Sequence, residues 1–264
     1  MTQRLDHVVL PVADLDVARA RLSALGFTVA PDGVHPFGTA NCCVFFADGA
    51  YLEPLAIWDA SIAADAIRAG NVFVARDHVF RAVVGDEGLS AVVLTTPDAD
   101  ADHARFSAQG IAIGDVLNFS REFSDPSGRK DIASFKLAFA GDADIADAFA
   151  FTCERVNTPD VDRSALQRHD NGVTGIAGLV LVDGAQNFAS LLERLGADEQ
   201  LVDVRFAQGK EASRTVLALV LYADLPALQL ALEANAIPFS RHDTNITVPP
   251  APGQGVHFIF EASP

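Results

Sequence analysis

The sequence of 264 residues contains no run approaching the roughly 18 apolar residues that a membrane-spanning helix requires. It also lacks a basic leader followed by an apolar stretch, because the N-terminal residues run straight into a strand-like pattern. Neither a membrane span nor a secretory signal is therefore predicted, and we expect a cytoplasmic protein.

Basic residues are few relative to acidic ones. Lysine and arginine total 19 against 35 aspartate and glutamate residues, which gives a formal net charge of −16 at pH 7. Such a surface repels nucleic-acid backbones and anionic membranes, so we expect neither as a partner. The net charge says little about a small ligand, because a local pocket can oppose the overall field. A small-molecule substrate or ligand remains the expected partner.

Cysteine is also scarce. The three cysteines, Cys42, Cys43 and Cys153, form no even disulfide framework and no CxxC metal motif. Cys42 and Cys43 point to opposite faces if their segment is a strand. We expect all three to be buried, reduced thiols.

What the sequence does contain is a fourfold internal repeat. Four segments of equal length share an apolar strand, a turn and an amphipathic helix, and they align without gaps. They are LDHVVLPVADLDVARARLSALGF from Leu5, LSAVVLTTPDADADHARFSAQGI from Leu89, GIAGLVLVDGAQNFASLLERLGA from Gly175 and TVLALVLYADLPALQLALEANAI from Thr215. Because half of the residues are hydrophobic, each pair of units can bury a core of its own.

Each repeat has clear helix boundaries. Asp14 can cap the first helix, and its equivalents are Asp98, Gly184 and Asp224. Gly26 ends that helix, and Gly110 and Gly196 occupy the same place, as a C-terminal cap requires. The fourth unit has Ala236 there, which is a weaker signal.

Further strands follow each helix. The first unit continues with FTVAPDGV, NCCVFFAD and AYLEPLAI, the last two joined at the hairpin signal Asp48-Gly49. The second unit continues with IAIGDVLNF, DIASFKLAF and AFAFTCERV, and the fourth completes the same count. The predicted order of elements in all three units is therefore βαβββ. The third, only 40 residues long, is expected to lack a strand.

The units predict an α+β protein of paired modules. A single βαβββ unit leaves a concave sheet face exposed, and two units side by side close that face into a cavity. We expect a first domain at residues 1–158, with an insert at 59–88 that begins as a helix and continues less regularly. The polar segment 157–174 is the expected boundary before a second, reduced domain at residues 172–264.

This pattern resembles the vicinal-oxygen-chelate superfamily. The residues that carry the resemblance are the first repeat and the following HPFGTANCCVFFADGAYLEPLAI, with NFSREF, FKLAFA and FAFTCERV in the second unit. The superfamily includes glyoxalase I, extradiol dioxygenases and fosfomycin- and bleomycin-resistance proteins, and the chain is most similar to its glyoxalase-like domain proteins. The resemblance implies tandem modules, a cavity site and frequent pairing of chains into homodimers.

The resemblance also implies a metal site. In the superfamily, metal ligands come from the first and last strands of two paired units, and His7 and Glu53 match the first pair. Imidazole and carboxylate suit Zn, Ni, Mn or Fe and leave open positions for a pair of substrate oxygens. Glu53 would then act as a ligand, or as a base next to a carbonyl in lyase- or isomerase-type chemistry. The alternative for His7 is a neutral ring that hydrogen-bonds within its strand.

The second unit departs from this ligand pattern. Ala91 stands where the second unit should supply its first ligand. Glu154 in the last strand is the remaining candidate, and whether it faces the cavity depends on a strand register that the sequence does not fix. The equivalents of His7 in units three and four are Ala177 and Leu217, so no metal is expected there.

Other polar residues are candidate substrate-binding groups. His35, Thr39 and Asn41 lie in HPFGTAN, a loop entering a strand, and either line a pocket or hold the turn. Arg121 could bind a substrate carboxylate, or pair with Glu122 or Asp125. The acidic run from Asp98 to His103 is expected at a helix N-terminus rather than at a metal.

Two functions therefore remain open. The first is an enzyme acting on a small α-oxo or vicinally oxygenated substrate, with His7 and Glu53 at its centre. The second is a metal-free protein that sequesters a drug or metabolite in the same cavity, which Ala91 favours.

Overall fold

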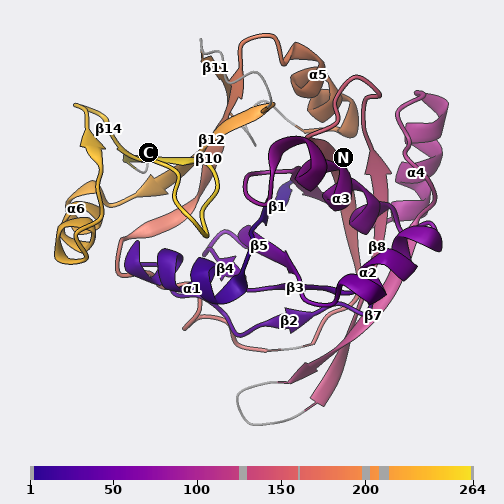
Figure 1. Cartoon of the computed structure of the whole chain (residues 1–264), viewed down its shortest axis with the longest axis horizontal. Helices are drawn as coiled ribbons and strands as arrows, with labels where there is room; N and C mark the ends of the chain where they lie inside the picture. The colour runs from indigo at the N-terminus through magenta and orange to yellow at the C-terminus, as the bar shows by residue number, and fades with distance from the viewer. Residues whose placement is uncertain (1–2, 125–129, 160, 198–202, 208–213, 263–264) are drawn as a thin grey trace.

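A computed structural model describes residues 3–124, 130–159, 161–197, 203–207 and 214–262 (Figure 1). Within these residues the chain is an α+β protein with two sheets. The first sheet contains β1 (Leu5–Pro11), β2 (Gly33–Val34), β3 (Thr39–Asn41), β4 (Val44–Phe45), β5 (Tyr51–Ile57), β6 (Ala91–Thr95), β7 (Leu117–Ser124), β8 (Lys130–Ala140) and β9 (Phe149–Asn157). The second contains β10 (Val173–Val182), β11 (Asp203–Ala207), β12 (Val216–Ala223), β13 (Ser240–Arg241), β14 (Asn245–Val248) and β15 (His257–Ala262).

The first sheet is built around the antiparallel pair β1 and β6, the opening strands of the first two repeats. Each opening strand lies parallel to the last strand of its own repeat, β1 beside β5 and β6 beside β9. The order along the sheet is β2-β3-β5-β1-β6-β9-β8-β7, with β4 paired to β5. The second sheet has the order β11-β10-β12-β15-β14-β13. The strand that NCCVFFAD predicts is split into β3 and β4, and the hairpin at Asp48-Gly49 is confirmed by the Phe46–Ala50 backbone bond of 2.8 Å.

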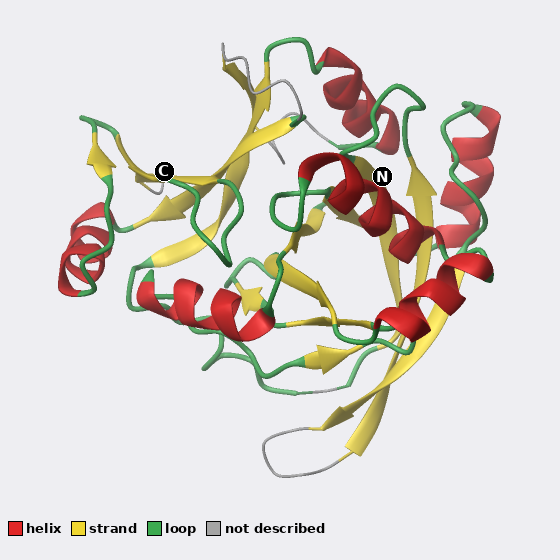
Figure 2. Cartoon of the chain, viewed as in Figure 1, coloured by secondary structure: helices red, strands yellow, loops and turns green. Residues whose placement is uncertain are grey.

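Six helices are described, and four of them belong to the repeats (Figure 2). They are α1 (Leu15–Ala24), α4 (Ala99–Ala108), α5 (Gln186–Leu195) and α6 (Leu225–Ala234). Asp14, Asp98 and Asp224 cap α1, α4 and α6 through their carboxylates, as predicted. The helix α5 instead starts after Ala185 without a side-chain cap, so the repeat is less regular there. None of the described helices is long and apolar enough to cross a bilayer.

The ends of the repeat helices show one conformation in all four copies. Gly26, Gly110 and Gly196 have φ of +89°, +68° and +101°, the left-handed region that glycine adopts at little cost. Ala236 takes the same place in the fourth copy with φ of +51°. It is the only residue other than glycine with positive φ in the described part of the chain, so the repeat geometry is retained at the cost of strain.

The insert between the first two repeats is more regular than the sequence predicted. Its beginning forms α2 (Ala60–Arg68), as expected. The stretch expected to be irregular forms α3 (Val72–Val84), a helix capped by Asn71. Buried Val72, Phe73 and Val74 follow one another in its first turn, so burial on several sides hides the periodicity by which a helix is recognised in a sequence.

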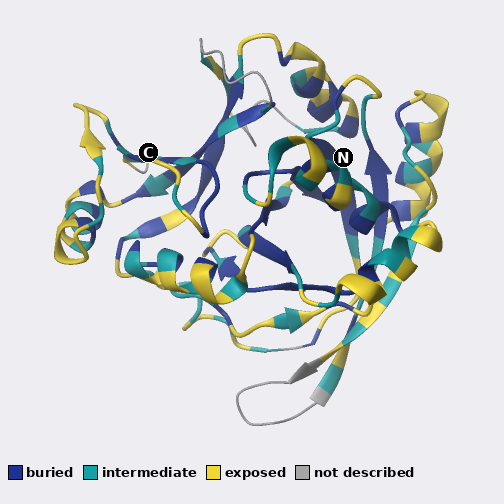
Figure 3. Cartoon of the chain, in the orientation of Figure 1, coloured by how far each residue is buried: buried dark blue, intermediate teal, exposed yellow. Residues whose placement is uncertain are grey.

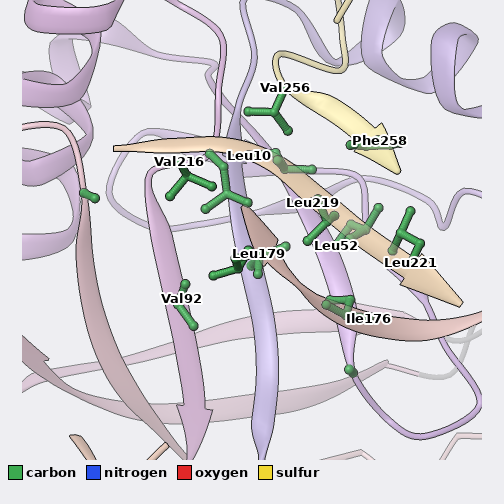
Figure 4. Close-up of a cluster of buried hydrophobic side chains, with 14 of the residues drawn as sticks. Leu10, Leu52, Val92, Ile176, Leu179, Val216, Leu219, Leu221, Val256 and Phe258 are labelled. Carbon is green, nitrogen blue, oxygen red and sulfur yellow. The ribbon is translucent and has the colours of Figure 1, made fainter. Parts of the chain in front are cut away.

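The two faces of the first sheet have different neighbours. Val8, Leu10, Leu52 and Val92 point toward the second sheet and share a core with side chains such as Leu179, Leu219 and Phe258 (Figure 4). The alternate residues on β1 and β5, among them His7, Val9 and Glu53, point to the opposite face, where α2 and α3 cover part of the sheet. Figure 3 shows these central strands almost wholly buried, whereas exposed residues lie on outer helix faces, in turns and on outlying strands such as β7 and β13.

The segment between the two sheets is anchored by polar side chains. Asn171 is fully buried and donates to the backbone oxygen of Leu25 at 2.9 Å. The ring of His169 lies between the backbone of Thr28 and that of Phe45, at 3.0 Å from each. Both residues therefore hold this segment against the first repeat and take no part in the cavity.

Candidate functional site

His7 and Glu53 meet in a cavity of about 40 Å³ on the face of the first sheet that α2 and α3 partly cover. Both side chains are buried, with 3% and 5% of their surface exposed. The cavity is lined by His7, His35, Phe37, Asn41, Tyr51, Glu53, Phe73, Phe119, Arg121, Phe135, Leu137, Phe151 and Cys153. The structure thus brings together all the sequence-predicted site residues of the first unit except Thr39. Thr39 does not line the cavity but contacts the ring of His35.

Strand register explains why His7 and Glu53 meet. The parallel pairing of β1 with β5 sets His7 beside Tyr51 and Val9 beside Glu53. The His7 ring stacks on Tyr51 with the ring centroids 4.4 Å apart, and the edge of Phe151 approaches it at 5.7 Å. These two aromatic neighbours fix the plane of the imidazole, so that its Nε2 faces Glu53.

A continuous chain of polar contacts passes through the site. Arg155 donates to Oδ1 of Asp6 at 2.8 Å and forms an ion pair with the same carboxylate, and Asp6 Oδ1 lies 2.7 Å from Nδ1 of His7. On the other side of the ring, Nε2 of His7 lies 3.2 Å from Oε2 of Glu53. Asn41 donates to Oε1 of the same carboxylate at 2.6 Å. Charges therefore alternate from Arg155 to Glu53, which allows them to be buried together.

The surroundings shift the pKa values of both central groups toward their charged forms. Burial alone would lower the pKa of His7, but its hydrogen bonds to Asp6 and Glu53 and their negative charges raise it above the ordinary value. Burial alone would raise the pKa of Glu53, but the contacts with His7, the charge of His35 and the bond from Asn41 bring it to about 2. Both shifts favour the charged forms, an imidazolium beside a carboxylate.

His35 sits differently from His7. Burial lowers the pKa of His35 to about 4, and the positive charges of Arg121 and His7 act in the same direction. Its Nδ1 lies 2.8 Å from the hydroxyl of Thr39, and its Nε2 lies 3.4 Å from the amide nitrogen of Asn41. The ring is thus neutral at pH 7, and Thr39 acts as its positioning partner.

The loop that carries His35 is held tightly by α2. Gly38 has φ of +84°, and its oxygen accepts from the backbone of Trp58 and of Asp59 at 3.1 and 3.2 Å. A Cβ at Gly38 would lie 2.5 Å from the backbone nitrogen of Ala63. The loop therefore requires glycine here, and the resulting close packing fixes His35 at the edge of the cavity.

Aromatic side chains make up most of the cavity wall. Phe37 stacks on His35 at 5.0 Å, and Phe119 stacks on Phe135 at 5.1 Å. Phe73 from α3 contacts Phe37 and Phe151 edge to face. The polar groups thus lie at one end of an otherwise apolar space, an arrangement typical of small-molecule sites.

Arg121 lies at the border of the cavity, on β7. Its guanidinium stands 6.0 Å from the Phe135 ring and packs so close to Gly33 that any Cβ there would clash with it. Asp125, one of the two acidic residues predicted as alternative partners of Arg121, lies outside the described residues. The location of Arg121 is compatible with the predicted contact to a substrate.

Glu154 does not join His7 and Glu53, contrary to the expectation from the sequence. Its carboxylate accepts from the backbone nitrogen of Ala99 at 2.9 Å and so caps α4. The register gives the reason. Ala91 pairs with Phe149 as His7 pairs with Tyr51, so the residue equivalent to Glu53 is Phe151. Glu154 lies on the alternate face of β9, whereas Cys153 faces the cavity.

This register also decides how well the site suits a divalent metal. The first repeat supplies His7 and Glu53, but the matching positions of the second are the methyl of Ala91 and the phenyl of Phe151. Within the described residues no group of three or more His, Cys, Asp or Glu side chains is placed to hold a metal ion. Two donors already bound to each other do not make a site for Zn, Ni, Mn or Fe. The acidic run from Asp98 to His103 lies at the start of α4, as predicted.

Asp6, Arg155 and Tyr51 are parts of the site that the sequence did not reveal. Strand alternation places Asp6 on the face opposite His7, but the β1–β6 register shifts between Leu5 and His7. Such a bulge re-aims a side chain, and Asp6 reaches the ring of its own neighbour. The one signal that the sequence offered for Asp6 was an acidic residue next to a histidine in an apolar strand. The three cysteines are free and buried, as predicted.

Comparisons with known proteins agree with this architecture. A family model described as glyoxalase-like domain matches residues 5–196. A hypothetical protein from Staphylococcus aureus has a similar structure with a TM-score of 0.65 and 13% identity, covering 99% of this chain and 100% of that one.

Two further structures share the fold. A Mn(II)-bound glyoxalase from Novosphingobium aromaticivorans has a TM-score of 0.55 and 12% identity over 99% of this chain and 83% of that one. A catechol 2,3-dioxygenase has a TM-score of 0.56 and 12% identity over 99% and 88%. Among curated proteins, none matches the sequence. Since the family model spans well over half of the residues, the chain belongs to the glyoxalase-like domain family.

Proposed function

We propose that this glyoxalase-like protein binds a small oxygenated organic molecule in the His7–Glu53 cavity without a metal ion. The observation that carries the proposal is the replacement of the second pair of ligands by Ala91 and Phe151. With those positions apolar, His7 and Glu53 satisfy each other, and the cavity combines a charged end with an aromatic wall.

The polar end of the cavity favours a ligand with a hydroxyl or enol group. Each oxygen of Glu53 accepts one bond, from Asn41 or from His7, and retains a lone pair for a ligand donor. The neutral ring of His35 adds a second polar group beside it. The phenyl rings around this end exclude water and strengthen such a hydrogen bond.

The proposal includes the modular organisation expected from the sequence. The strands of residues 5–157 would be two paired βαβββ modules enclosing the cavity, and residues 173–262 a reduced second domain. The equivalent placement of β1–β5 and β6–β9 supports the pairing. Association of two chains into a homodimer stays a prediction.

A second candidate function is lyase- or isomerase-type chemistry on an α-oxo substrate. The observation that favours it is an ionised carboxylate, Glu53, in an apolar cavity, where it could take a proton from a carbon next to a carbonyl. The Mn(II)-bound glyoxalase with the same fold makes added Mn²⁺ the appropriate condition for the assay.

Calorimetric titration with lactate, pyruvate and mandelate tests the first function. We expect at least one of them to bind equally well with and without a chelator, and Glu53→Gln to weaken it by tenfold or more. Glu154→Gln is the matched control, because that carboxylate lies at the α4 cap. Loss of binding on chelation, or no binding of any of the three acids, would contradict the proposal.

Isomerisation of the methylglyoxal hemithioacetal, measured with and without Mn²⁺, tests the second function. Turnover that Glu53→Gln abolishes and Glu154→Gln leaves unchanged would make the protein an enzyme. Absence of turnover under both conditions would leave binding as its function.

A further inference from the structure

A second, larger hollow continues the cavity outward. This outer groove has a volume of about 280 Å³ and is lined by Val34, His35, Pro36, Trp58, Ile62, Ser120, Arg121 and Glu122. His35 and Arg121 line both spaces, so the groove and the cavity share one border. The lining comes from β2, the loop after it, the end of β5, α2 and β7.

The sizes of the two spaces restrict what can bind. A water molecule needs at least about 10–15 Å³ of such volume, so the inner cavity of about 40 Å³ holds only a few non-hydrogen atoms. Organic ligands occupy sites of about 300–1,000 Å³. Only the groove and the cavity together approach that size, so a ligand longer than lactate whose polar end reaches Glu53 must extend into the groove.

The groove exposes apolar side chains that a folded protein would otherwise cover. Val34, Trp58 and Ile62 are exposed by 50%, 54% and 37%, and all three line it. Trp58 is the only tryptophan of the chain. The backbone at Trp58 is held in place, since Trp58 and Asp59 both donate to the oxygen of Gly38. An exposed cluster on rigid elements is typical of a binding surface.

The border between the two spaces carries a positive charge. Arg121 lies there in a protein of net charge −16, and the room for its guanidinium comes from the missing side chain at Gly33. An arginine fork suits a carboxylate, which it binds through two parallel hydrogen bonds. Three chemical features thus follow one another: a hydrogen-bond acceptor inside, a cation at the border and an apolar surface outside.

We propose that the ligand is a 2-hydroxy carboxylic acid, or its 2-oxo form as the enol, with an extended apolar chain. The hydroxyl reaches Glu53, the carboxylate lies on Arg121, and the chain lies against Val34, Trp58 and Ile62. This assignment rests on the proposed function and adds to it the chemical class of the ligand and a second binding surface.

The fluorescence of Trp58 reports on the groove directly, because no other tryptophan contributes. The series lactate, 2-hydroxybutanoate, 2-hydroxyhexanoate and 2-hydroxyoctanoate keeps the polar end constant while the chain grows. Each methylene buried is worth up to about fourfold in affinity, so we expect Kd to fall about two- to fourfold per methylene along the series. Octane-1,2-diol, which lacks the carboxylate, should bind at least tenfold more weakly than 2-hydroxyoctanoate.

Two variants separate the groove from the cavity. Ile62→Glu places a charge in the groove and should weaken 2-hydroxyoctanoate by tenfold or more, while calorimetry shows lactate binding unchanged. Val83→Glu, at an exposed apolar site on α3 outside the groove, is its control and should change neither. Arg121→Gln should remove the preference for the acid over the diol.

The outcomes distinguish this inference from the proposed function. If lactate binds but Kd does not change along the series, or Ile62→Glu has no effect, the groove assignment is wrong and the cavity assignment survives. If Arg121→Gln leaves the preference for the acid intact, the carboxylate contact is wrong. If no member of the series binds by fluorescence or calorimetry, both proposals fail.

Discussion

Nε2 of His7 and Oε2 of Glu53 lie 3.2 Å apart in a space that excludes nearly all solvent from both side chains. Removal of one partner leaves the other buried with only its remaining neighbour, Asp6 for His7 or Asn41 for Glu53, and breaking a buried pair costs about 3–5 kcal/mol. We therefore expect His7→Leu and Glu53→Leu each to lower the free energy of unfolding by about 3 kcal/mol. The double variant should lose less than the sum, and urea denaturation of all four proteins measures the coupling.

The exposed pair Arg68–Asp65 is the control for that cycle. Both of its side chains are about two thirds exposed, so Asp65→Asn should change the free energy of unfolding by less than about 0.5 kcal/mol. Strictly additive losses in the His7 and Glu53 variants would show that the two side chains are not coupled.

The donor set predicts that the protein holds no divalent metal tightly. Elemental analysis after dialysis should find much less than one equivalent of Zn, Ni, Mn or Fe, and a chelator should leave Tm unchanged. The double substitution Ala91→His and Phe151→Glu supplies the missing pair by register, and we expect it to raise Tm when Zn²⁺ or Mn²⁺ is added. A full equivalent of metal in the wild-type protein would contradict this interpretation.

His35 should make the fold sensitive to acid. Its pKa is lowered to about 4, whereas the unfolded chain takes up this proton near pH 6.5. The contribution of His35 to the free energy of unfolding is therefore fully present above pH 6.5. It is lost as the pH falls toward 4. At pH 5 the expected loss is on the order of 2 kcal/mol relative to pH 7.5.

Urea unfolding of wild type and His35→Gln at these two pH values measures the effect of His35. The variant should lose less stability on acidification than wild type, by that amount. The raised pKa of His7 acts in the opposite direction, since its contribution is lost as the pH rises, and it cancels between the two proteins. If both proteins lose the same free energy of unfolding on acidification, the assignment of a neutral ring to His35 is wrong.

Gly38 holds the loop of His35 against α2. Gly38→Ala combines positive φ with a Cβ only 2.5 Å from the backbone of Ala63, so the loop must move. Gly49 has a similar φ of +93° and nothing within 4 Å of an added Cβ. We expect Gly49→Ala to cost about 1–2 kcal/mol from the backbone alone. Gly38→Ala should cost more and also weaken ligand binding, which calorimetry and urea denaturation would show.

Ala236 offers a simple stabilising substitution. Its φ of +51° is unfavourable for a residue with a Cβ, and the three equivalent positions are glycine. Ala236→Gly should raise the free energy of unfolding by about 1 kcal/mol, and urea denaturation measures it. A decrease would mean that the flexibility of glycine in the unfolded chain outweighs the relieved strain.

The repeat units, three of the four helix caps, the hairpin at Asp48-Gly49 and the pairing of His7 with Glu53 could be predicted from the sequence. These features depend on residues close in the chain, or on a repeated pattern whose copies support one another. The helix α3 was missed because consecutive buried residues in its first turn hide the helical periodicity. The placement of Glu154 was open because strand register depends on neighbours distant in the chain.

The sequence by itself determined that the chain consists of repeated strand–helix units and that one unit carries a histidine and a glutamate on the same face. Periodicity, capping residues and turn glycines act locally, so they can be recognised without a partner. Only the tertiary structure decided that Phe151 occupies the position equivalent to Glu53 and that a bulge turns Asp6 toward His7. The tertiary structure also places Trp58 and Arg121 in one groove, because sheet register and the packing of α2 bring together residues far apart in the chain.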